Sequence, residues 1–385
     1  MNSRHFFVLF LSILFCGSIF CKSKEEDIKT LRFSNGVYPI FFDIAVDSVK
    51  NLKTGKLSES SADCGTCHKK IYENWRGSRH SQAFTNPLYK QSHEKEPMSW
   101  CLNCHAPFLQ TSSDPKDPNQ RLQSEDGVSC ITCHVRDGKI LVSNLPTQTE
   151  NVHEYKQTEL LASEEFCANC HQFNFPDKES VTKQKNFISY SNLQMQNTVE
   201  EWKQSYWYGK KNCQSCHLLS NSSKSHTFPG GHHIQKLRDS FSVFLEKSSE
   251  STYIVSLFAE DIGHSFPTGD LFRSLRLRVL DQKGIVIQEW RLGKTYEENR
   301  NASLTDAIKY LSEDIVLDPP KDRSKSSSKK FVFRSITKEK QFRYELFIDF
   351  VNPTTHIFGK LNSESTLLKF KSGELTASEW NGSKG

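Results

Sequence analysis

The chain has 385 residues, of which 36% are apolar, and a formal net charge of +5. This length exceeds one ordinary hydrophobic core and predicts two domains. The small excess of positive charge is no basis for nucleic-acid binding, and we expect none.

The first 21 residues have the layout of an export signal. Arg4 precedes an apolar run of fifteen residues, 6–20, and a charged stretch follows it. The run is shorter than the roughly twenty apolar residues that a membrane-spanning helix needs. Cys21 stands where a bacterial lipoprotein is cut and acylated, so the alternatives are a lipid anchor at Cys21, an uncleaved N-terminal anchor and ordinary signal cleavage. We expect an exported protein, either periplasmic or on the outer surface.

Residues 22–62 are predicted to be a polar linker. Within it, the apolar residues 38–44 form one candidate strand, and residues 51–62 are rich in serine, lysine and glycine. The segment therefore separates the export signal from the first folded domain.

The pentapeptide Cys-x-x-Cys-His then occurs five times between residues 64 and 217 and uses ten of the twelve cysteines. It is the attachment motif of c-type haem, because two thiols three residues apart add to the two vinyl groups of one porphyrin. The next residue, histidine, ligates the iron as the proximal ligand. The predicted attachment cysteines are Cys64, Cys67, Cys101, Cys104, Cys130, Cys133, Cys167, Cys170, Cys213 and Cys216. The predicted proximal ligands are His68, His105, His134, His171 and His217.

Zinc sites and redox motifs are the alternatives for Cys-x-x-Cys pairs. A zinc site needs four ligands, and five pairs cannot be divided into whole four-cysteine sites. A redox Cys-x-x-Cys occurs once, near a β-α-β pattern. We therefore expect five covalently bound haem c groups in a pentahaem domain over residues 63–236. At this density of motifs the domain is expected to be mainly α and rich in loops. Asp63 is a candidate N-cap for a helix that carries Ile71 and Trp75 on one face.

A sixth ligand for each iron has to come from outside the motifs. His80 lies twelve residues after His68, which is roughly 18 Å along a continuous helix, so we expect it to ligate a different haem. One or two of His226, His232 and His233 are expected to ligate, with His226 preferred. Since the mature chain has only two methionines, coordination by two histidines is favoured. The candidate distal ligands are His80, His93, His153, His226 and His264.

From residue 237 onward the chain has no cysteine and shows alternation of apolar and polar residues. This period of two predicts half-buried antiparallel strands, and residues 281–284 read as a hairpin turn between two of them. About seven short strands favour a β-sandwich-like domain over residues 237–385. The predicted strands include residues 242–245, 253–259, 275–279, 285–292, 330–336 and 342–350.

Three segments resemble a known family. Residues 64–84, residues 125–129 before the third motif and residues 197–205 before the fifth are similar to the multihaem cytochromes related to the tetrahaem electron carrier that partners hydroxylamine oxidoreductase. The resemblance implies closely stacked haems that conduct electrons, mostly with two histidines per iron. It also implies that His80 ligates a haem that is not its neighbour in sequence. The fifth motif and the long C-terminal extension depart from the tetrahaem pattern, so ligands cannot be carried over haem by haem.

One loop of the C-terminal part carries a second resemblance. Residues 263–270, Gly-His-Ser-Phe-Pro-Thr-Gly-Asp, resemble a Gly-His-x-x-Pro-Thr-Gly segment of β domains attached to multihaem cytochromes. His264 is therefore either a ligand that reaches a haem across the domain interface or a structural loop histidine.

These features predict electron transfer between redox donor and acceptor proteins, which can be membrane-bound. One alternative is an oxidoreductase in which one haem keeps an open site and acts on a small nitrogen or sulfur compound. Against it, no motif replaces the proximal histidine by lysine, as in nitrite-reducing relatives, and there are five motifs rather than the eight of hydroxylamine oxidoreductases. The other alternative is a docking subunit of an extracytoplasmic electron-transfer complex. We expect a carrier rather than an enzyme.

Overall fold

The computed structural model describes residues 49–58, 60–107, 126–136, 138–146, 152–183, 188–218, 225–322, 326–335, 340–351 and 366–379. The export signal, Cys21 and the candidate strand at residues 38–44 lie outside these ranges and stay predictions. Within the ranges, no helix is long and apolar enough to cross a membrane.

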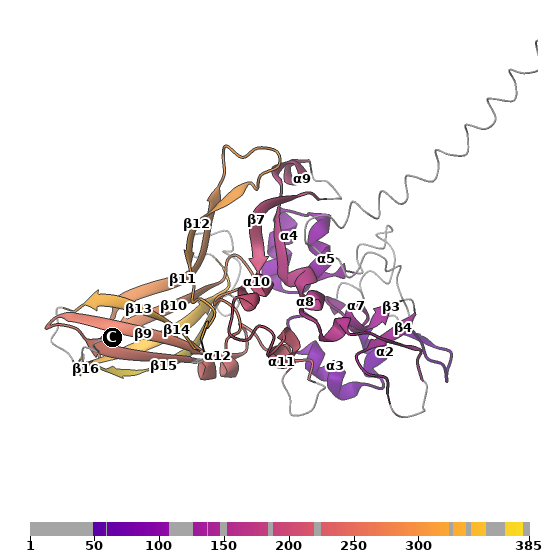
Figure 1. Cartoon of the computed structure of the whole chain (residues 1–385), viewed down its shortest axis with the longest axis horizontal. Coiled ribbons are helices and arrows are strands. Elements are labelled where there is room, and N and C mark those ends of the chain that lie inside the picture. The colour runs from indigo at the N-terminus through magenta and orange to yellow at the C-terminus, as the bar shows by residue number, and fades with distance from the viewer. Residues whose placement is uncertain are drawn as a thin grey trace, which may run out of the picture.

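Residues 49–240, here called the motif region, contain short helices joined by loops (Figure 1). The longest of these described helices has nine residues. The helices are α2 Ser61–Gly65, α3 Lys69–Arg76, α4 Pro87–Lys95, η1 Ser99–Cys101, α5 Leu102–His105, α7 Cys130–His134, η3 Leu160–Ala162, α8 Glu164–His171, α9 Lys178–Thr182, α10 Thr198–Lys203, α11 Cys213–His217 and α12 Ile234–Ser240.

Polar caps set the start of the helical turn at three of the motifs. Ser129 caps α7 and Asn212 caps α11, each by accepting a hydrogen bond from a backbone N–H three residues later. In both cases the first motif cysteine is the first helical residue, so the cap fixes the turn that spaces the two thiols. At the first motif, the prediction that Asp63 is the N-cap was wrong by three residues. Ser60 is the N-cap, and Asp63 is the third helical residue of a capping box.

The helix assumed between His68 and His80 does not continue. α3 ends at Arg76, where the Gly77 N–H bonds back to Glu73 and Trp75. The Trp75 indole is buried and its Nε1–H donates to the Val128 carbonyl at 2.9 Å, which ties α3 to the approach of the third motif. His80 therefore leaves the helix axis and turns back into the motif region.

Small β ribbons complete the motif region. Val49, at 1% exposure, packs in an apolar cluster with Ile131 and Val135. Val49, within the predicted linker, therefore packs against the third motif. The ribbons are β1 Val49–Lys50 with β2 Leu57–Ser58, β3 Val135–Arg136 with β4 Lys139–Val142 and β5 Tyr155–Gln157, and β6 Gln172–Pro176 with β7 Tyr190–Asn197.

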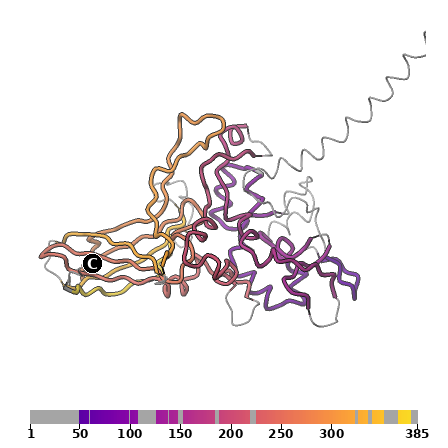
Figure 2. Tube along the Cα trace, in the orientation of Figure 1, coloured from indigo at the N-terminus to yellow at the C-terminus, as the bar shows by residue number. Residues whose placement is uncertain are grey.

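Residues 241–379, here called the β region, form two sheets beside the motif region (Figures 1 and 2). One sheet has the order β12-β11-β10-β14-β15 and the other β13-β9-β8-β16, with β16 parallel to β8. The strands are β8 Phe241–Lys247, β9 Thr252–Glu260, β10 Ser274–Leu280, β11 Val286–Glu298, β12 Lys309–Ile315, β13 Ser326–Arg334, β14 Gln341–Asp349, β15 Leu367–Thr376 and β16 Ser378–Glu379.

Alternate residues of both sheets share one apolar cluster. In β10, Leu275 and Leu277 are fully buried, while the arginines between them point to the other face. The hairpin at residues 281–284 is present: β10 pairs with β11, and Gly284 has φ +85°, which favours glycine. The alternation in the sequence therefore corresponds to burial on one face of each sheet. The limits predicted for the two domains remain a prediction.

β11 and β12 extend as an arm over the motif region (Figure 1). The Lys178 N–H donates to the Asp306 carbonyl at 2.7 Å, and the Glu179 N–H to the Leu304 carbonyl at 3.0 Å. The Tyr296 ring meets Phe175 with 5.2 Å between ring centres. The arm thus holds α9 and β6 against the β region.

A buried ion pair on β14 yields a test of this fold. Asp349 is 3% exposed and accepts hydrogen bonds from Arg276 and Arg291. We expect Asp349→Ala to lower the free energy of unfolding by about 3 kcal/mol, because two partly buried guanidinium groups lose their buried carboxylate partner. Urea unfolding of the holoprotein, followed by far-UV circular dichroism, measures this loss.

The matched control is Glu345→Ala on the same strand. Its partner Lys369 is half exposed, so the change should cost less than about 1 kcal/mol. Equal losses in the two variants would contradict the assignment of Asp349 as the buried anchor of the sheet.

Candidate haem-binding site

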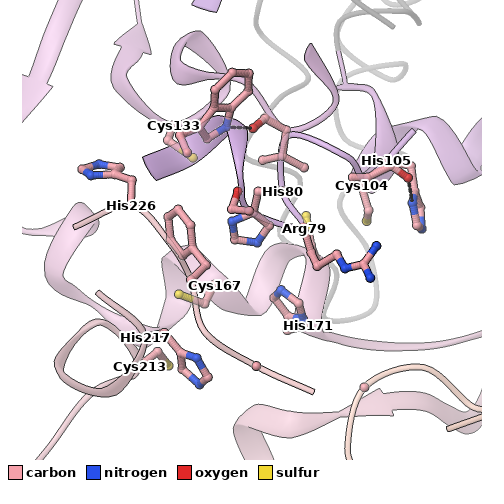
Figure 3. A pocket seen from close by; sticks show the side chains of 18 of the residues that line it. Arg79, His80, Cys104, His105, Cys133, Cys167, His171, Cys213, His217 and His226 are labelled. Carbon is pink, nitrogen blue, oxygen red and sulfur yellow. Dashed lines mark hydrogen bonds between the residues drawn. The ribbon is translucent and has the colours of Figure 1, made fainter. Parts of the chain in front are cut away.

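One continuous cavity of about 2030 Å³ runs through the motif region (Figure 3). Its lining includes all ten motif cysteines and every histidine within the described ranges. The predicted haem-binding residues of all five motifs and the predicted distal histidines therefore line one cavity.

Thiols of different motifs meet inside this cavity. Three pairs of thiols lie close enough to shift each other's pKa, namely Cys64 with Cys130, Cys170 with Cys104 and Cys167 with Cys213. The first motif is thus next to the third, the second next to the fourth, and the fourth next to the fifth. The described cysteines are all free thiols, so each remains available for a thioether bond.

Backbone carbonyls orient several proximal histidines. The Nδ1 atoms of His105 and His217 lie 2.8 Å from the carbonyl oxygens of Ala83 and Pro229, and Nδ1 of His134 lies 3.4 Å from that of Leu141. A carbonyl can only accept a hydrogen bond, so Nδ1 carries the proton in each of these rings. The Nε2 lone pair is then free for a metal, as in metal-binding histidines generally.

Three proximal histidines each face a histidine from outside the motifs. The ring centres are 6.3 Å apart for His171 with His80, 6.0 Å for His134 with His226, and 6.3 Å for His217 with His264. A metal bound about 2 Å from each of two imidazole nitrogens separates the ring centres by about 6 Å. The donor set and its spacing therefore fit an iron between each pair, as a haem with two histidine ligands requires.

Burial keeps these imidazoles neutral. It lowers the pKa of His80 to about 3, with a further decrease from His171 and His217. Burial also lowers the pKa of His217 to about 4, with His264 as the next cause. Neutral imidazole is the form that ligates iron, so these side chains are ready for a metal at neutral pH.

The β region supplies His264 through a clamped loop. Nδ1 of His264 lies 2.8 Å from the Ser265 carbonyl oxygen, which leaves Nε2 directed to the cavity side. Glu201 of α10, only 5% exposed, accepts hydrogen bonds from Thr268 Oγ1 at 2.6 Å and Lys294 Nζ at 3.0 Å. A buried carboxylate of the motif region thus fixes the loop and strand that carry His264.

The remaining predicted ligands have different surroundings. His93 has a buried Nε2, and His153 a buried Nδ1, for which no hydrogen-bond partner exists in the described residues. His93 lies on α4 near Tyr89, and Tyr89 stacks on His105 with 3.8 Å between ring centres. Both histidines line the cavity, but neither forms a facing pair of the kind seen for His80.

His226 is the member of its group that faces a proximal histidine, as preferred from the sequence. His232 instead contacts Arg79 and stacks on Phe350, and His233 caps α12 by accepting a hydrogen bond from the Lys236 N–H. Sequence reasoning did not find Glu201, Tyr89 or the cavity arginines Arg79 and Arg273. Of these residues, only Arg79 could have been found from the sequence, because it directly precedes the predicted ligand His80.

Removing the ligand from the β region tests its role. We expect His264→Ala to convert one-fifth of the irons to the high-spin state, because the iron at the fifth motif would keep a single protein ligand. Electron paramagnetic resonance (EPR) of the ferric holoprotein measures this fraction. His233→Ala is the control, since it removes a helix cap worth about 1 kcal/mol and no ligand. An unchanged spectrum of His264→Ala would contradict the assignment.

The clamp on this loop can be tested with two adjacent glutamates. We expect Glu201→Gln to lower the free energy of unfolding by about 2 kcal/mol, because Lys294 loses a charged hydrogen-bond partner. Urea unfolding followed at the haem absorbance band reports the loss at the site itself. Glu200→Gln removes only an exposed pair with Lys203 and should cost less than about 0.5 kcal/mol. A larger effect of Glu200→Gln would refute the clamp.

A family model and a solved structure resemble this chain. A family model described as "Cytochrome c554 and c-prime" matches residues 63–135, which hold the first three motifs. No curated protein matches the chain. A solved penta-heme cytochrome c552 from Thermochromatium tepidum is 18% identical with a TM-score of 0.62, and the match covers 82% of this chain and 98% of that chain.

Two other solved structures match only weakly. A β-glucuronidase from Bifidobacterium dentium is 10% identical, covering 35% of this chain and 16% of that chain, and a putative ApaA protein from Bordetella pertussis is 8% identical, covering 36% and 90%. Each has a TM-score of 0.17, too low to carry an argument. The family match and the shared fold with the penta-heme protein support the interpretation of this chain as a multihaem cytochrome c with covalently bound haem.

Proposed function

We propose that the protein is an exported pentahaem cytochrome c that transfers electrons along closely spaced haems, each of them ligated by two histidines. The observation that carries this proposal is the set of three facing histidine pairs, 6.0–6.3 Å apart, inside one cavity that also reaches all ten thiols. Two strong ligands on an iron leave it able to change oxidation state but not to bind a substrate.

The two remaining irons can be assigned by elimination. The proximal ligands His68 and His105 have no partner in the three pairs, and the predicted distal ligands His93 and His153 are also left over. We assign His93 to the iron of His105, since Tyr89 packs against both rings. His153 then serves the iron of His68. The buried Nε2 of His93, which has no hydrogen-bond partner in the described residues, supports the first of these assignments.

The spatial order of the motifs suits an electron carrier. The fourth motif is next to the second and the fifth through its two cysteines, and Cys170 also packs against the apolar cluster of Ile131 and Val135 at the third motif. Each haem would supply a one-electron couple between ferric and ferrous iron. The chain holds the five groups side by side, supplies neutral imidazole ligands and keeps them in a shared cavity.

The partners and the location follow as parts of the same proposal. Haem attachment of this kind takes place outside the cytoplasmic membrane, in line with the export signal expected in the first 21 residues. The donor and acceptor are redox proteins, and they can be membrane-bound. The β region contributes His264 to a haem, so its role goes beyond that of a docking module.

Electron counting separates a carrier from an enzyme. We expect the fully reduced holoprotein to deliver five electrons per molecule to ferricyanide, one for each haem. In catalytic amounts, with a chemical electron donor or acceptor, it should not accelerate the consumption of nitrite, hydroxylamine or sulfite. Multiple turnovers with any of these three compounds would contradict the carrier function and favour the oxidoreductase alternative.

A further inference from the structure

Two arginines line the cavity without an acidic partner. Arg79 directly precedes His80 in the motif region, and Arg273 directly precedes β10 in the β region. Within the described ranges no carboxylate oxygen lies within 4.0 Å of either guanidinium group, although ion pairs are plentiful elsewhere in the β region. Two positive charges from different regions therefore line the same cavity without an ion pair.

The polar contacts of both groups are few and neutral. Arg79 contacts His232 Nδ1 with Nη2 at 2.6 Å and Gln82 Oε1 with Nη1 at 3.2 Å. Arg273 donates from Nη1 to the Thr268 carbonyl at 3.2 Å, and its Nε is buried without any partner. Asp270 lies close enough to raise the pKa of Arg273, but its Oδ1 accepts from the Phe272 N–H and it forms no ion pair.

Arg273 is partly buried and its Nε is enclosed without a partner, while Arg79 is an exposed residue whose side chain reaches the same cavity. Enclosing the charge of Arg273 without a counter-ion has a desolvation cost, and the charge of Arg273 lowers the pKa of Arg79. An anion between the two groups would offset both effects. A guanidinium group binds carboxylates through two parallel hydrogen bonds, and the buried Nε of Arg273 is one of the donors that such a fork uses.

The position of the two arginines indicates which anion they would bind. Arg79 projects into the pocket beside His80 and His171 in Figure 3, and the charge of Arg273 is the second cause, after burial, that lowers the pKa of His171. The group expected between these two histidines is a haem, which carries two propionate carboxylates. The charge, the donor geometry and the location thus agree on one ligand that arrives with the cofactor itself.

We propose that Arg79 and Arg273 form a carboxylate-binding site for the propionates of the haem held by His80 and His171. This inference rests on the ligation given under the proposed function. The ferrous haem carries one more negative charge than the ferric haem, so both arginines stabilise the reduced state. The iron at the fourth motif, which is next to three other motifs, would then have a raised reduction potential and would collect electrons from its neighbours.

A redox titration of the holoprotein followed by haem absorbance tests the site. In Arg79→Gln and in Arg273→Gln we expect the same one of five components to move to lower potential, with the other four unchanged. The control is Arg343→Gln, which removes an equal charge from an exposed position of β14 outside the cavity. It should leave all five components in place. Unchanged potentials in both cavity variants would overturn the proposal.

Two further measurements keep the test decisive. If a glutamine variant loads haem poorly, Arg79→Lys and Arg273→Lys keep the charge and lose the fork, and each should move the same component by a smaller step. Adding sulfite or phosphate to the wild type should not shift any component. A saturable shift that is lost in Arg79→Gln would mean that the site takes a free anion, which also overturns the proposal.

The ferric low-spin content of the same samples separates this inference from the proposed function. Unchanged potentials with full low-spin content refute the propionate site alone. A His80→Ala variant that is fully loaded with haem and gains no high-spin iron over the wild type refutes the ligation on which the site depends.

Discussion

The constraint on which the motif region depends is the pairing of imidazoles, with ring centres 6.0–6.3 Å apart, in three places inside one cavity. Each pair joins segments that are far apart in sequence, so the loops between motifs have to return to a common cavity. Short helices and polar caps are sufficient under this constraint, because thioether and axial bonds would hold the chain where a large apolar core is missing. The low fraction of apolar residues in the chain, 36%, is consistent with a small apolar core in the motif region.

The β region is held together by an ordinary hydrophobic core. Its two sheets share one apolar core and need no cofactor for their packing. This stable body carries the His264 loop, the Lys294 end of the clamp, the β11–β12 arm and Arg273 toward the motif region. A rigid scaffold of this kind can present a ligand and a cation at fixed positions to groups that the motif region holds loosely. The two regions therefore act as one site.

Local patterns in the sequence predicted local structure well. The five pentapeptides form compact helical turns, and the alternation at residues 275–279 corresponds to a strand with one buried face. β12 was missed because most of its residues are exposed, which removes the period of two on which strand prediction depends. The extension of β11 beyond Leu292 was missed for a related reason, since the arm contacts the motif region and not its own core.

The candidate site was predictable only in part. The thiols and proximal histidines follow from spacing alone, because each motif is complete within five residues. The partner of each proximal histidine depends on tertiary structure, so His80 and His264 stayed candidates until their rings were placed. Glu201 and Arg273 give no signal in the sequence, because a buried charge cannot be distinguished there from a solvated one.

The central claim is that every iron has two strong protein ligands, and spin-integrated EPR of the fully loaded ferric protein tests it most directly. The account predicts that all five irons are low-spin. A high-spin signal that integrates to one-fifth of the iron or more would contradict it, because at least one haem would then have an open coordination position.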